Sequence, residues 1–558
     1  MPSKIIILAS AALIAATPAL AVEEGFAERA QALVDAAYPD DKPGAAVVVT
    51  EGGKVIYAGG SGAANIERGV PITADTVFRF ASITKQFSAA ALLKLVAEGK
   101  LSLDDPLSKF VPDYPAPGST ATVRQLLNHT SGIQSYTGIP GWMNENKTAR
   151  TYTTAELIAE FSGEPAEFQP GERWNYNNSG YVLVGAVIEA VTGKPWHEVV
   201  REKFAGPLGL STIRYGGEEA ATPGFATGYT DNGDGTFMVA QKIDMSVPHA
   251  AGGLIGTVGD LARWNQALHH GKVLPEALYR EMITPTALPG GKSEPYGYGI
   301  GLSDVRGTPA IGHSGGIFGF STNSIYVPEK DLFVAVFVNS VSGVPSSGTA
   351  MMRLAAEAIG KPFPVMAEVA FDPSSIEDAY GVYRIEGGEA TRAFYRREGQ
   401  LFTRREGGQE SRVYFVGENR FFYGPDSLTW FELVRGDDGG YAMLMHHDGV
   451  DQAERATRAG PIPAEAATVA VDQQVLASYV GNYTSPIAPI VVALEDGGAL
   501  TLKFAAQPAT PLRAIGEAEF AAVGVDATVN FQAEAAKVTG LVIRQGGRDL
   551  PASRDAGQ

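Results

Sequence analysis

Two kinds of hydrophobic pattern alternate along the first 360 residues. Apolar positions that recur every three or four residues predict helices over 25–38, 84–98, 181–191, 259–269 and 350–359. Continuous or alternating apolar runs predict strands over 45–49, 55–57, 324–327 and 332–338. The predicted strands therefore stand at the two ends of this segment, and most of the helices lie between them.

An antiparallel sheet accounts for this order of elements. Its halves would come from distant parts of the chain, and the helical middle would be inserted between them. Gly52-Gly53 separates the first two strands, which predicts a hairpin at the start of the fold. We therefore expect an α/β fold in which helices flank an antiparallel sheet and an all-helical insert meets it at a cleft.

Beyond residue 370 the sequence repeats itself at an offset of 100 residues. Both copies consist of short strand-like runs and glycine turns, which are typical of small β-barrels or sandwiches. The coinciding residues are Gly381 and Gly481, Tyr383 and Tyr483, Gly424 and Gly524, Asp426 and Asp526, Phe431 and Phe531, and Gly440 and Gly540. We expect a large domain over 22–365 and two small all-β domains over 371–459 and 473–556.

Residues 1–21 have the pattern of an export signal. Lys4 precedes an apolar run over 5–16, and Ala19-Leu20-Ala21 is a small-residue cleavage pattern. The apolar run is shorter than the roughly 20 residues that a membrane-spanning helix needs. We expect a cleaved signal peptide, a periplasmic or secreted protein, and no stable insertion in a membrane.

Composition narrows the partners and the chemistry. The formal net charge is −18, and such a surface repels nucleic acid and anionic lipid. The chain has no cysteine, which excludes disulfides, thiolate catalysis and zinc sites built on sulfur. His269-His270 and His446-His447 are adjacent pairs, which suit neither a helical nor a strand metal site. We expect neither a metal nor another cofactor.

Ser82 and Lys85 are candidates for a nucleophile and its base. Three residues apart on a helix, their side chains lie on one face, where the amine can take the hydroxyl proton. The apolar segments on both sides predict that Lys85 is buried. Burial is needed, because lowering a lysine pKa from about 10.4 towards 7 takes roughly 4 to 5 kcal/mol. A helix start with an exposed lysine is the alternative.

A second candidate lies in the loop 170–181, ahead of a predicted helix. Tyr176 and Asn178 are two residues apart and would point the same way. Tyr176 would relay a proton, and Asn178 would bind Lys85 or a substrate carbonyl. The alternative is a turn rich in Asn and Gly that has no catalytic role.

The third candidate is the small-residue string His313-Ser314-Gly315-Gly316. Such a string lets a strand backbone approach a ligand, so the N–H groups of Gly316 and Ser82 would hold an oxyanion and His313 would line the cleft. The string also fits Gly-x-Ser-x-Gly, a nucleophile elbow with Ser314 as nucleophile. An elbow requires a helix after the serine, whereas the residues that follow are predicted to be extended.

Two further polar residues are weaker candidates. His129 is expected to tie a turn through its ring nitrogens rather than to act in catalysis. Asp260 has the position of an acidic residue at a helix start.

In this order, the three motifs resemble the serine β-lactamase and DD-peptidase superfamily, and within it the branch of class C β-lactamases, esterases and D-aminopeptidases. The resemblance spans about 44–360. It implies that Ser82 is the nucleophile and Lys85 the base, and it places Tyr176 and Asn178 in the Tyr-x-Asn loop. His313-Ser314-Gly315 stands where β-lactamases carry Lys-Thr-Gly. A mostly neutral imidazole there disfavours an efficient β-lactamase.

The resemblance implies a serine hydrolase that acts through an acyl-enzyme on Ser82. The paired β-domains look most like those of D-aminopeptidases, which favours a peptidase or amidase of the D-aminopeptidase or DD-peptidase type. A carboxylesterase on the same site, a weak β-lactamase and a penicillin-binding protein are the alternatives. The expected partner is a small peptide, amide or ester, while the exact substrate, its stereochemistry and a homodimeric state are left open.

Overall fold

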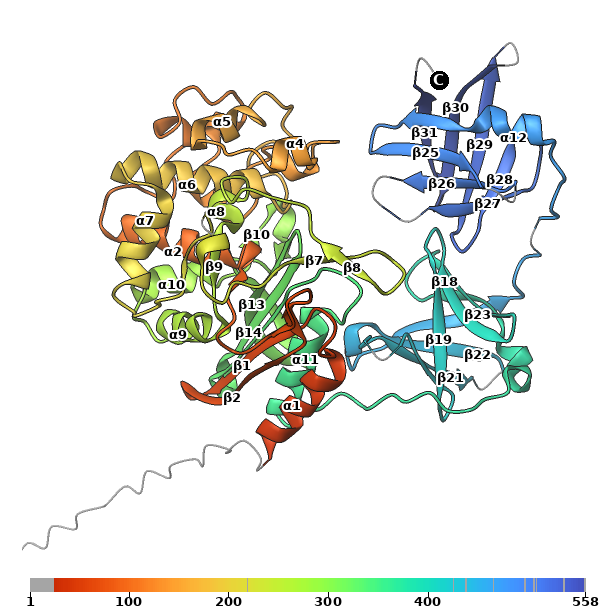
Figure 1. The fold of residues 1–558 in the computed structure, drawn as a ribbon, viewed down its shortest axis with the longest axis horizontal. Helices are drawn as coiled ribbons and strands as arrows, with labels where there is room; N and C mark the ends of the chain where they lie inside the picture. Colours follow the sequence, from red (N-terminus) through yellow and green to blue (C-terminus); the bar gives the residue numbers. More distant parts are fainter. Residues whose placement is uncertain are drawn as a thin grey trace, which may run out of the picture.

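A computed structural model describes residues 25–555, except 218, 425, 437–438, 465, 496–497, 505–506, 508 and 535–536. The predicted signal peptide over 1–21 lies outside the described residues. Figure 1 shows a mixed unit that ends with α11 (Ser347–Ala358), followed by two all-β units. None of the described helices is long and apolar enough to cross a membrane.

The centre of the mixed unit is a six-stranded antiparallel sheet. In spatial order its strands are β12 (Gly301–Val305), β13 (Thr308–Ile317), β14 (Phe320–Val327), β15 (Leu332–Val338), β1 (Ala45–Glu51) and β2 (Lys54–Ser61). Ala45 lies opposite both Val338 and Ser61. This pairing joins the start of the unit to its end, which confirms the predicted sheet built from distant segments.

Both faces of this sheet are covered. The odd-numbered residues of β1 from Ala45 to Val49 pack with α1 (Phe26–Ala37) and α11, whereas Ala46 and Val48 pack with the inserted helices. Successive residues of a strand point to opposite faces, so a strand covered on both sides is apolar throughout. This explains the uninterrupted apolar run in the sequence of β1.

The insert between β2 and β12 is mainly helical, with short strands among the helices. Its helices are α2 (Thr84–Ala97), α3 (Val123–Leu127), α4 (Glu145–Thr148), α5 (Thr154–Ala159), α6 (Asn178–Thr192), α7 (Trp196–Val200), α8 (His249–Gly252), α9 (Val258–His269) and α10 (Glu276–Met282). Its strands are β3 (Ala63–Asn65), β4 (Val70–Pro71), β5 (Phe78–Arg79), β6 (Arg214–Tyr215), β7 (Tyr229–Asp231), β8 (Phe237–Val239), β9 (Leu254–Gly256), β10 (Thr286–Ala287) and β11 (Ser293–Glu294).

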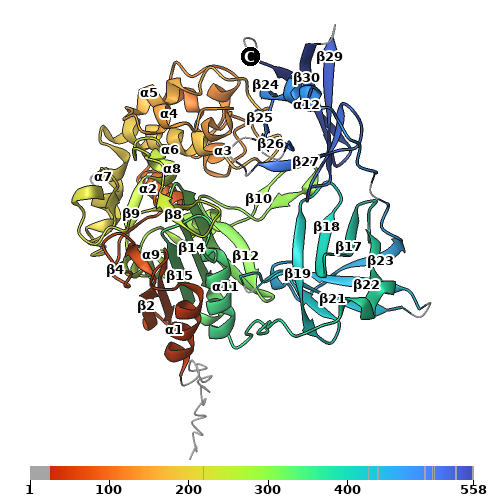
Figure 2. The same ribbon diagram turned by 45° about the vertical axis from the view of Figure 1, so that its right-hand side comes forward.

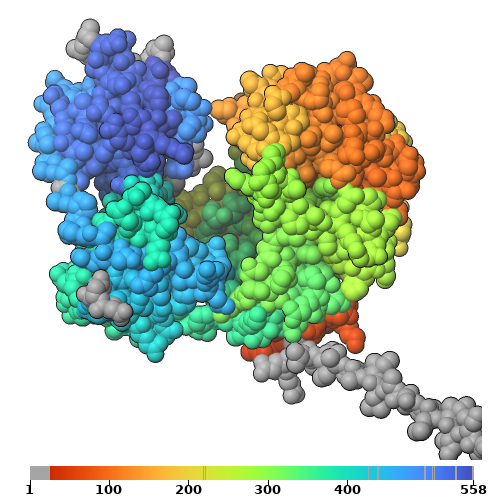
Figure 3. Space-filling model, turned by 180° about the vertical axis from the view of Figure 1, so that it is seen from behind, coloured from red at the N-terminus to blue at the C-terminus, as the bar shows by residue number. Residues whose placement is uncertain are grey.

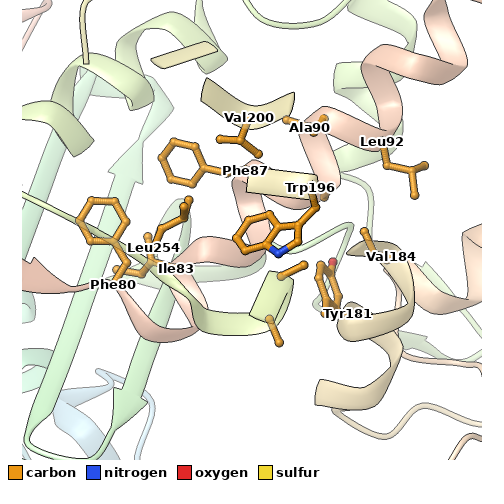
Figure 4. Packing of buried hydrophobic residues seen from close by; sticks show 14 of the residues in the cluster. Phe80, Ile83, Phe87, Ala90, Leu92, Tyr181, Val184, Trp196, Val200 and Leu254 are labelled. Carbon is orange, nitrogen blue, oxygen red and sulfur yellow. The ribbon is translucent and has the colours of Figure 1, made fainter. Parts of the chain in front are cut away.

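Helix α2 lies in the core of the unit and is buried on all sides from Thr84 to Leu93. Figure 4 shows Phe87 of α2 near Trp196 of α7, which in turn lies near Tyr181 of α6. Phe87 also stacks on Trp264, with ring centroids 4.1 Å apart. A helix that is apolar on all sides is enclosed by protein. The predicted burial of Lys85 is thereby confirmed.

Each C-terminal unit is a closed antiparallel barrel of eight strands. The strands of the first are β16 (Gly381–Ile385), β17 (Thr391–Arg397), β18 (Gln400–Arg405), β19 (Glu410–Gly417), β20 (Arg420–Phe422), β21 (Trp430–Arg435), β22 (Tyr441–His446) and β23 (Glu454–Gly460). Those of the second are β24 (Gly481–Thr484), β25 (Pro489–Leu494), β26 (Leu500–Phe504), β27 (Thr510–Ala514), β28 (Glu519–Ala522), β29 (Ala527–Glu534), β30 (Lys537–Gln545) and β31 (Arg548–Arg554). The expectation of two small all-β units is confirmed.

The two barrels agree in detail. Tyr383 and Tyr483 are fully buried, and each hydroxyl donates to the carbonyl oxygen four residues earlier, over 2.5 and 2.7 Å. A short helix precedes each first strand, the 3₁₀ helix Pro373–Ala379 in one barrel and α12 (Gln473–Tyr479) in the other. The offset of 100 residues in the sequence thus persists in the fold, as expected for a duplication.

The barrels stand beside the mixed unit, one after the other (Figure 2). The first barrel contacts the mixed unit through an ion pair between Arg306 and Asp451, with N and O atoms 2.8 Å apart. It contacts the second barrel through its β18–β19 turn, where the N–H of Gly407 donates to Asp526 over 2.8 Å. Figure 3 shows a hollow between the barrels and the mixed unit.

Candidate active site

The site begins at a backbone feature just before α2. Ala81 has a φ of +48°, in the left-handed region that costs roughly 1 kcal/mol or more for a residue with a Cβ. It opens the 3₁₀ turn Ala81–Ile83, which carries Ser82 and leads directly into the helix. The Ser82 Oγ then lies 3.0 Å from the Lys85 Nζ. The predicted pairing across one helical turn is present.

Lys85 is completely buried and has three polar neighbours. Besides Ser82, they are the Oδ1 of Asn178 at 2.9 Å and the carbonyl oxygen of Ala251 at 2.8 Å. The described residues include no carboxylate within ion-pair distance of this amine. Burial therefore holds the pKa of Lys85 well below its ordinary value.

The three neighbours of Lys85 match the valences of a neutral amine. A neutral amine has two N–H donors and one lone pair. The amide oxygen of Asn178 and the carbonyl oxygen of Ala251 are acceptors only, so they take both donors. The lone pair is left facing the hydroxyl of Ser82. Lys85 is thus placed to accept that proton.

Asn178 is held in the orientation that this arrangement needs. It is the first residue of α6, and its Nδ2 donates to the Thr137 Oγ1 over 3.1 Å. The backbone N–H of Asn178 donates to the Ser135 Oγ over 3.2 Å. With its nitrogen bound to Thr137, the amide must present its oxygen to Lys85.

Tyr176 lies over the same lysine, with its ring centroid 4.9 Å from the Lys85 Nζ. Burial raises the pKa of its phenol, and a hydrogen bond with Ser82 lowers it to a smaller extent. The phenol therefore stays protonated at neutral pH. Tyr176 and Asn178, which the sequence paired, do converge on Ser82 and Lys85.

His129 holds the loop that carries Tyr176. Its φ is +62°, and its carbonyl oxygen accepts from the N–H of Asn175 over 3.0 Å. Its Nδ1 accepts from the N–H of Asn177 over 3.1 Å. His129 thus holds the loop immediately before and immediately after Tyr176. The contact of its Nδ1 is the tie through a ring nitrogen that was predicted. The His129 Nε2 is buried and finds no hydrogen-bond partner in the described part of the chain.

His313 is neutral, and its hydrogen bonds fix its tautomer. The Nδ1 lies 2.6 Å from the carbonyl oxygen of Ser314, an acceptor, so Nδ1 carries the proton. The Nε2 then accepts from the hydroxyl of Tyr296 over 2.8 Å. Burial, helped by the neighbouring Lys85, lowers the pKa of His313 to about 3.

The glycines after His313 bring strand β13 against the nucleophile. A Cβ at Gly315 would collide with the carbonyl oxygen of Phe80, next to the turn that holds Ser82. Strand β12 ends its pairing at Gly312, so the rest of β13 has a free edge. Residues of an antiparallel strand bond alternately to each side. Ile317 pairs with Phe320 at the hairpin, so its backbone N–H points to β14. The N–H of the preceding residue, Gly316, therefore points to the free edge, which is where the oxyanion was expected.

The elbow hypothesis for Ser314 is wrong. Ser314 lies within β13, opposite Asn323 of β14, and a hairpin rather than a helix follows it. Asp260 sits in the first turn of α9, completely buried, where it accepts from the N–H of Thr212 over 2.6 Å. The expected place at a helix start is therefore correct. No cluster of three or more potential metal ligands occurs among the described residues.

Four contributors to the site carry no signal in the sequence. Ala251 acts through a backbone carbonyl, Thr137 through a contact with Asn178, and Tyr296 through a contact with His313. Ser135 binds only a backbone N–H. All four residues are far from Ser82 in sequence, so only the folded chain brings them to it.

Comparison with known proteins agrees with this geometry. The family model described as Beta-lactamase matches residues 30–358, more than half of the chain. The chain belongs to the Beta-lactamase family. Ser82, Lys85, Tyr176 and the His313 strand all lie within the matched segment.

Several relatives of this chain have names of hydrolases. A D-aminopeptidase from Gluconobacter oxydans is 27% identical over 61% of this chain and 64% of that protein, so the match spans less than two thirds of the relative. Esterase EstB from Burkholderia gladioli is 30% identical over 53% of this chain and 86% of the esterase. The crystal structure of a D-stereospecific amidohydrolase from Streptomyces is similar with a TM-score of 0.52 and 30% identity, over 60% of this chain and 99% of that one. The Beta-lactamase family member described here is thus similar to proteins named as an aminopeptidase, an esterase and an amidohydrolase.

The hold of His129 on the Tyr176 loop predicts a graded response to substitution. His129→Ala removes the acceptor for Asn177 and should lower kcat/KM about ten- to a hundredfold, as misplacement of a catalytic group does. His129→Asn should restore most of the activity, because Asn tolerates positive φ and its Oδ1 can replace Nδ1. Steady-state kinetics of the two variants, with circular dichroism to verify folding, tests this. Equal losses in both folded variants would contradict a positioning role.

Proposed function

We propose that this protein is an exported serine hydrolase that forms an acyl-enzyme on Ser82 and acts on amide bonds as a peptidase or amidase. The observation that carries the proposal is the completely buried Lys85, whose Nζ lies 3.0 Å from the Ser82 Oγ and whose pKa burial holds well below its ordinary value. Export rests on the signal-like residues 1–21 and implies a periplasmic or secreted location.

Acylation begins with the transfer of the Ser82 hydroxyl proton to the Lys85 Nζ. The Oγ forms a bond to the substrate carbonyl carbon, and the carbonyl oxygen becomes an oxyanion. The N–H groups of Ser82 and Gly316 stabilise that oxyanion, each donor contributing roughly 3 to 4 kcal/mol. Gly316 is suited to this role because its N–H lies on the unpaired edge of β13.

The leaving amine needs a proton before the C–N bond breaks. Tyr176 holds a proton at neutral pH, because burial raises the pKa of its phenol, and it interacts with Ser82. We assign to Tyr176 the donation of this proton to the leaving nitrogen, with the Lys85 ammonium returning a proton to Tyr176. Water then attacks the ester of Ser82 with Lys85 and Tyr176 in the reverse roles, and the acid leaves.

The pocket at Tyr176 and His313 favours uncharged substrates. A cavity of about 310 Å³ is lined by Tyr176, Tyr296 and residues from β12, β13, β14 and α11, among them Ser303, His313 and Met351. None of its lining residues is a lysine, arginine or acid, and burial keeps His313 neutral. A carboxylate in this pocket would lose water without gaining a cation. This disfavours β-lactams and free peptide C-termini and favours uncharged amides, in line with the similarity to a D-aminopeptidase.

A carboxylesterase is the second candidate. The same neutral pocket accepts esters, whose leaving groups need less protonation than amines do. The 30% identity with esterase EstB from Burkholderia gladioli also favours it. Parallel assays with a D-amino-acid amide, a short acyl ester and nitrocefin separate the two from a β-lactamase.

Ser82→Ala should lower turnover of the best of these substrates by about a thousandfold or more, since the nucleophile is lost. Intact-protein mass spectrometry of the wild type, quenched during turnover, should show the mass of one acyl group. Ser314→Ala serves as the matched control and should keep the adduct. An adduct that persists in Ser82→Ala, or undiminished turnover, would contradict the assignment of Ser82. A stable penicillin adduct without turnover would identify a penicillin-binding protein instead.

The pH profile of kcat/KM should report Lys85. The base must be neutral, so activity is lost as pH falls through the pKa of Lys85 and is full above it. Because burial holds that pKa well below the ordinary 10.5, the acidic limb should lie well below pH 10.5. A profile that keeps rising towards pH 10.5 would show that Lys85 behaves as an ordinary lysine.

Charge introduced into the pocket should change the substrate preference. Ser303 is exposed and lines the cavity, so Ser303→Lys adds a cation without disturbing the core. The predicted quantity is the ratio of kcat/KM for a peptide with a free C-terminal carboxylate to kcat/KM for the same peptide with a C-terminal amide. This ratio should rise about two- to fivefold in Ser303→Lys, because an exposed ion pair contributes about that much. Ser303→Gln is the neutral control. An unchanged preference in Ser303→Lys would contradict substrate binding in this cavity.

A further inference from the structure

A second pocket lies on the other side of helix α8 from Lys85. Its volume is about 530 Å³, and its lining includes Thr154, Glu189, Trp196, Tyr215 and His249. These residues come from the start of α5, the end of α6, the start of α7, β6 and the start of α8. The helices α5 and α7 lie on the side of the mixed unit that faces away from the barrels (Figure 1). The catalytic steps described above use none of these side chains.

Glu189 places a carboxylate in this pocket, and no lysine or arginine of the described residues forms an ion pair with it. Its two oxygens accept from the hydroxyl of Thr154 over 2.7 Å and from the N–H of Trp196 over 3.2 Å, both neutral donors. The nearest titratable base is His249, whose Nε2 lies 3.8 Å away. Burial lowers the pKa of His249 to about 3, so that ring is neutral. Lys194, which also lines the pocket, is paired with Glu202.

Aromatic rings surround this carboxylate. His197 and Tyr215 stack in parallel, with centroids 4.4 Å apart and an interplanar angle of 13°. Trp196 meets the edge of each of these rings at about 6 Å. Ring faces attract cations, and a partly exposed carboxylate attracts them more strongly. The Glu189 side chain is 26% exposed, so a ligand can reach it.

We propose that this pocket binds a small organic cation, a primary ammonium attached to an apolar or aromatic group, and that its occupancy is coupled to the active site through α8. The ammonium donates to Glu189, and the apolar part rests on the rings of His197 and Tyr215. This site lies beyond the hydrolase function proposed above, and its ligand binding does not depend on that function.

His249 provides the coupling. Its φ is +45°, a strained conformation that makes the start of α8 sensitive to what its side chain contacts. Its Nε2 is 3.1 Å from the Thr154 hydroxyl, which in turn donates to Glu189. Its ring lies so close to Gly185 of α6 that a Cβ there would collide with it. The His249 side chain thus joins the pocket to both α6 and α8.

Those two helices hold the base of the proposed reaction. Helix α6 supplies the Oδ1 of Asn178 to Lys85, and α8 supplies the carbonyl oxygen of Ala251 to it. The preceding carbonyl, that of Ala250, accepts from Ser88 of α2 over 2.7 Å. A displacement of His249 by a ligand therefore changes the position of a direct partner of Lys85.

Calorimetric titration of the whole chain with benzylammonium, and with benzyl alcohol as its neutral counterpart, tests the site. The wild type should bind benzylammonium at least about tenfold more tightly than benzyl alcohol, because only the cation pairs with Glu189. Glu189→Gln removes the charge but leaves one amide oxygen to accept from the N–H of Trp196, and it should weaken benzylammonium binding at least about tenfold. Glu198→Gln, with the same change of charge outside the pocket lining, should retain the affinity. Equal affinities in Glu189→Gln and wild type would overturn the site, since the amine would then bind elsewhere.

Steady-state kinetics at saturating benzylammonium tests the coupling separately. In the wild type, benzylammonium should change kcat at least about twofold. In Glu189→Gln, the same concentration of benzylammonium should leave kcat unchanged from its value without ligand. Purely competitive inhibition in both proteins would overturn the coupling, because it would place the amine in the substrate cleft. Calorimetric binding in a chain that hydrolyses none of the substrates would support the site while refuting the hydrolase function.

Discussion

The burial of one amine without a counter-ion organises this site. Moving the charged form of Lys85 out of water costs several kcal/mol, and no carboxylate among the described residues forms an ion pair that offsets this cost. The neutral form is satisfied by two acceptors and one hydroxyl. This arrangement favours a base at position 85 over a cation, with the hydroxyl of Ser82 in direct contact with it.

The architecture explains how the acceptors reach that amine. The 3₁₀ turn Ala81–Ile83 carries Ser82, and helix α2, which follows it, carries Lys85. Asn178 of α6 and Ala251 of α8 each place a carbonyl oxygen against the amine. Strand β13 approaches from the sheet, where Gly315 allows backbone contact with Phe80. The sheet is itself closed by the pairing of β1 with β15, so the site depends on contacts between the two ends of the unit.

Local pattern was sufficient for the elements and for the reacting pair. The helix period places Ser82 and Lys85 on one face whatever surrounds them, and the run of apolar residues in α2 predicts enclosure. The continuous run in β1 likewise predicts a strand covered on both sides. In the barrels, the spacing of Tyr383 and Tyr483 revealed the duplication. A barrel differs from a sandwich in the pairing of its first and last strands, and no local pattern encodes that pairing.

Tertiary contacts account for what the sequence did not predict. The carbonyl of Ala251 carries no side-chain signal, and the left-handed conformations of Ala81, His129 and His249 violate local preference in favour of the site. Such conflicts concentrate where function is exerted.

The protonation state of Lys85 is the most direct test of this account. Nuclear magnetic resonance of protein labelled with ¹³C at the lysine Cε, with Lys85→Arg to assign the signal, reads that state without reference to any substrate. The account predicts that at pH 7 the Lys85 Cε resonates as a neutral amine, apart from the ammonium signals of the other lysines. An ammonium signal for Lys85 at pH 7 would contradict it.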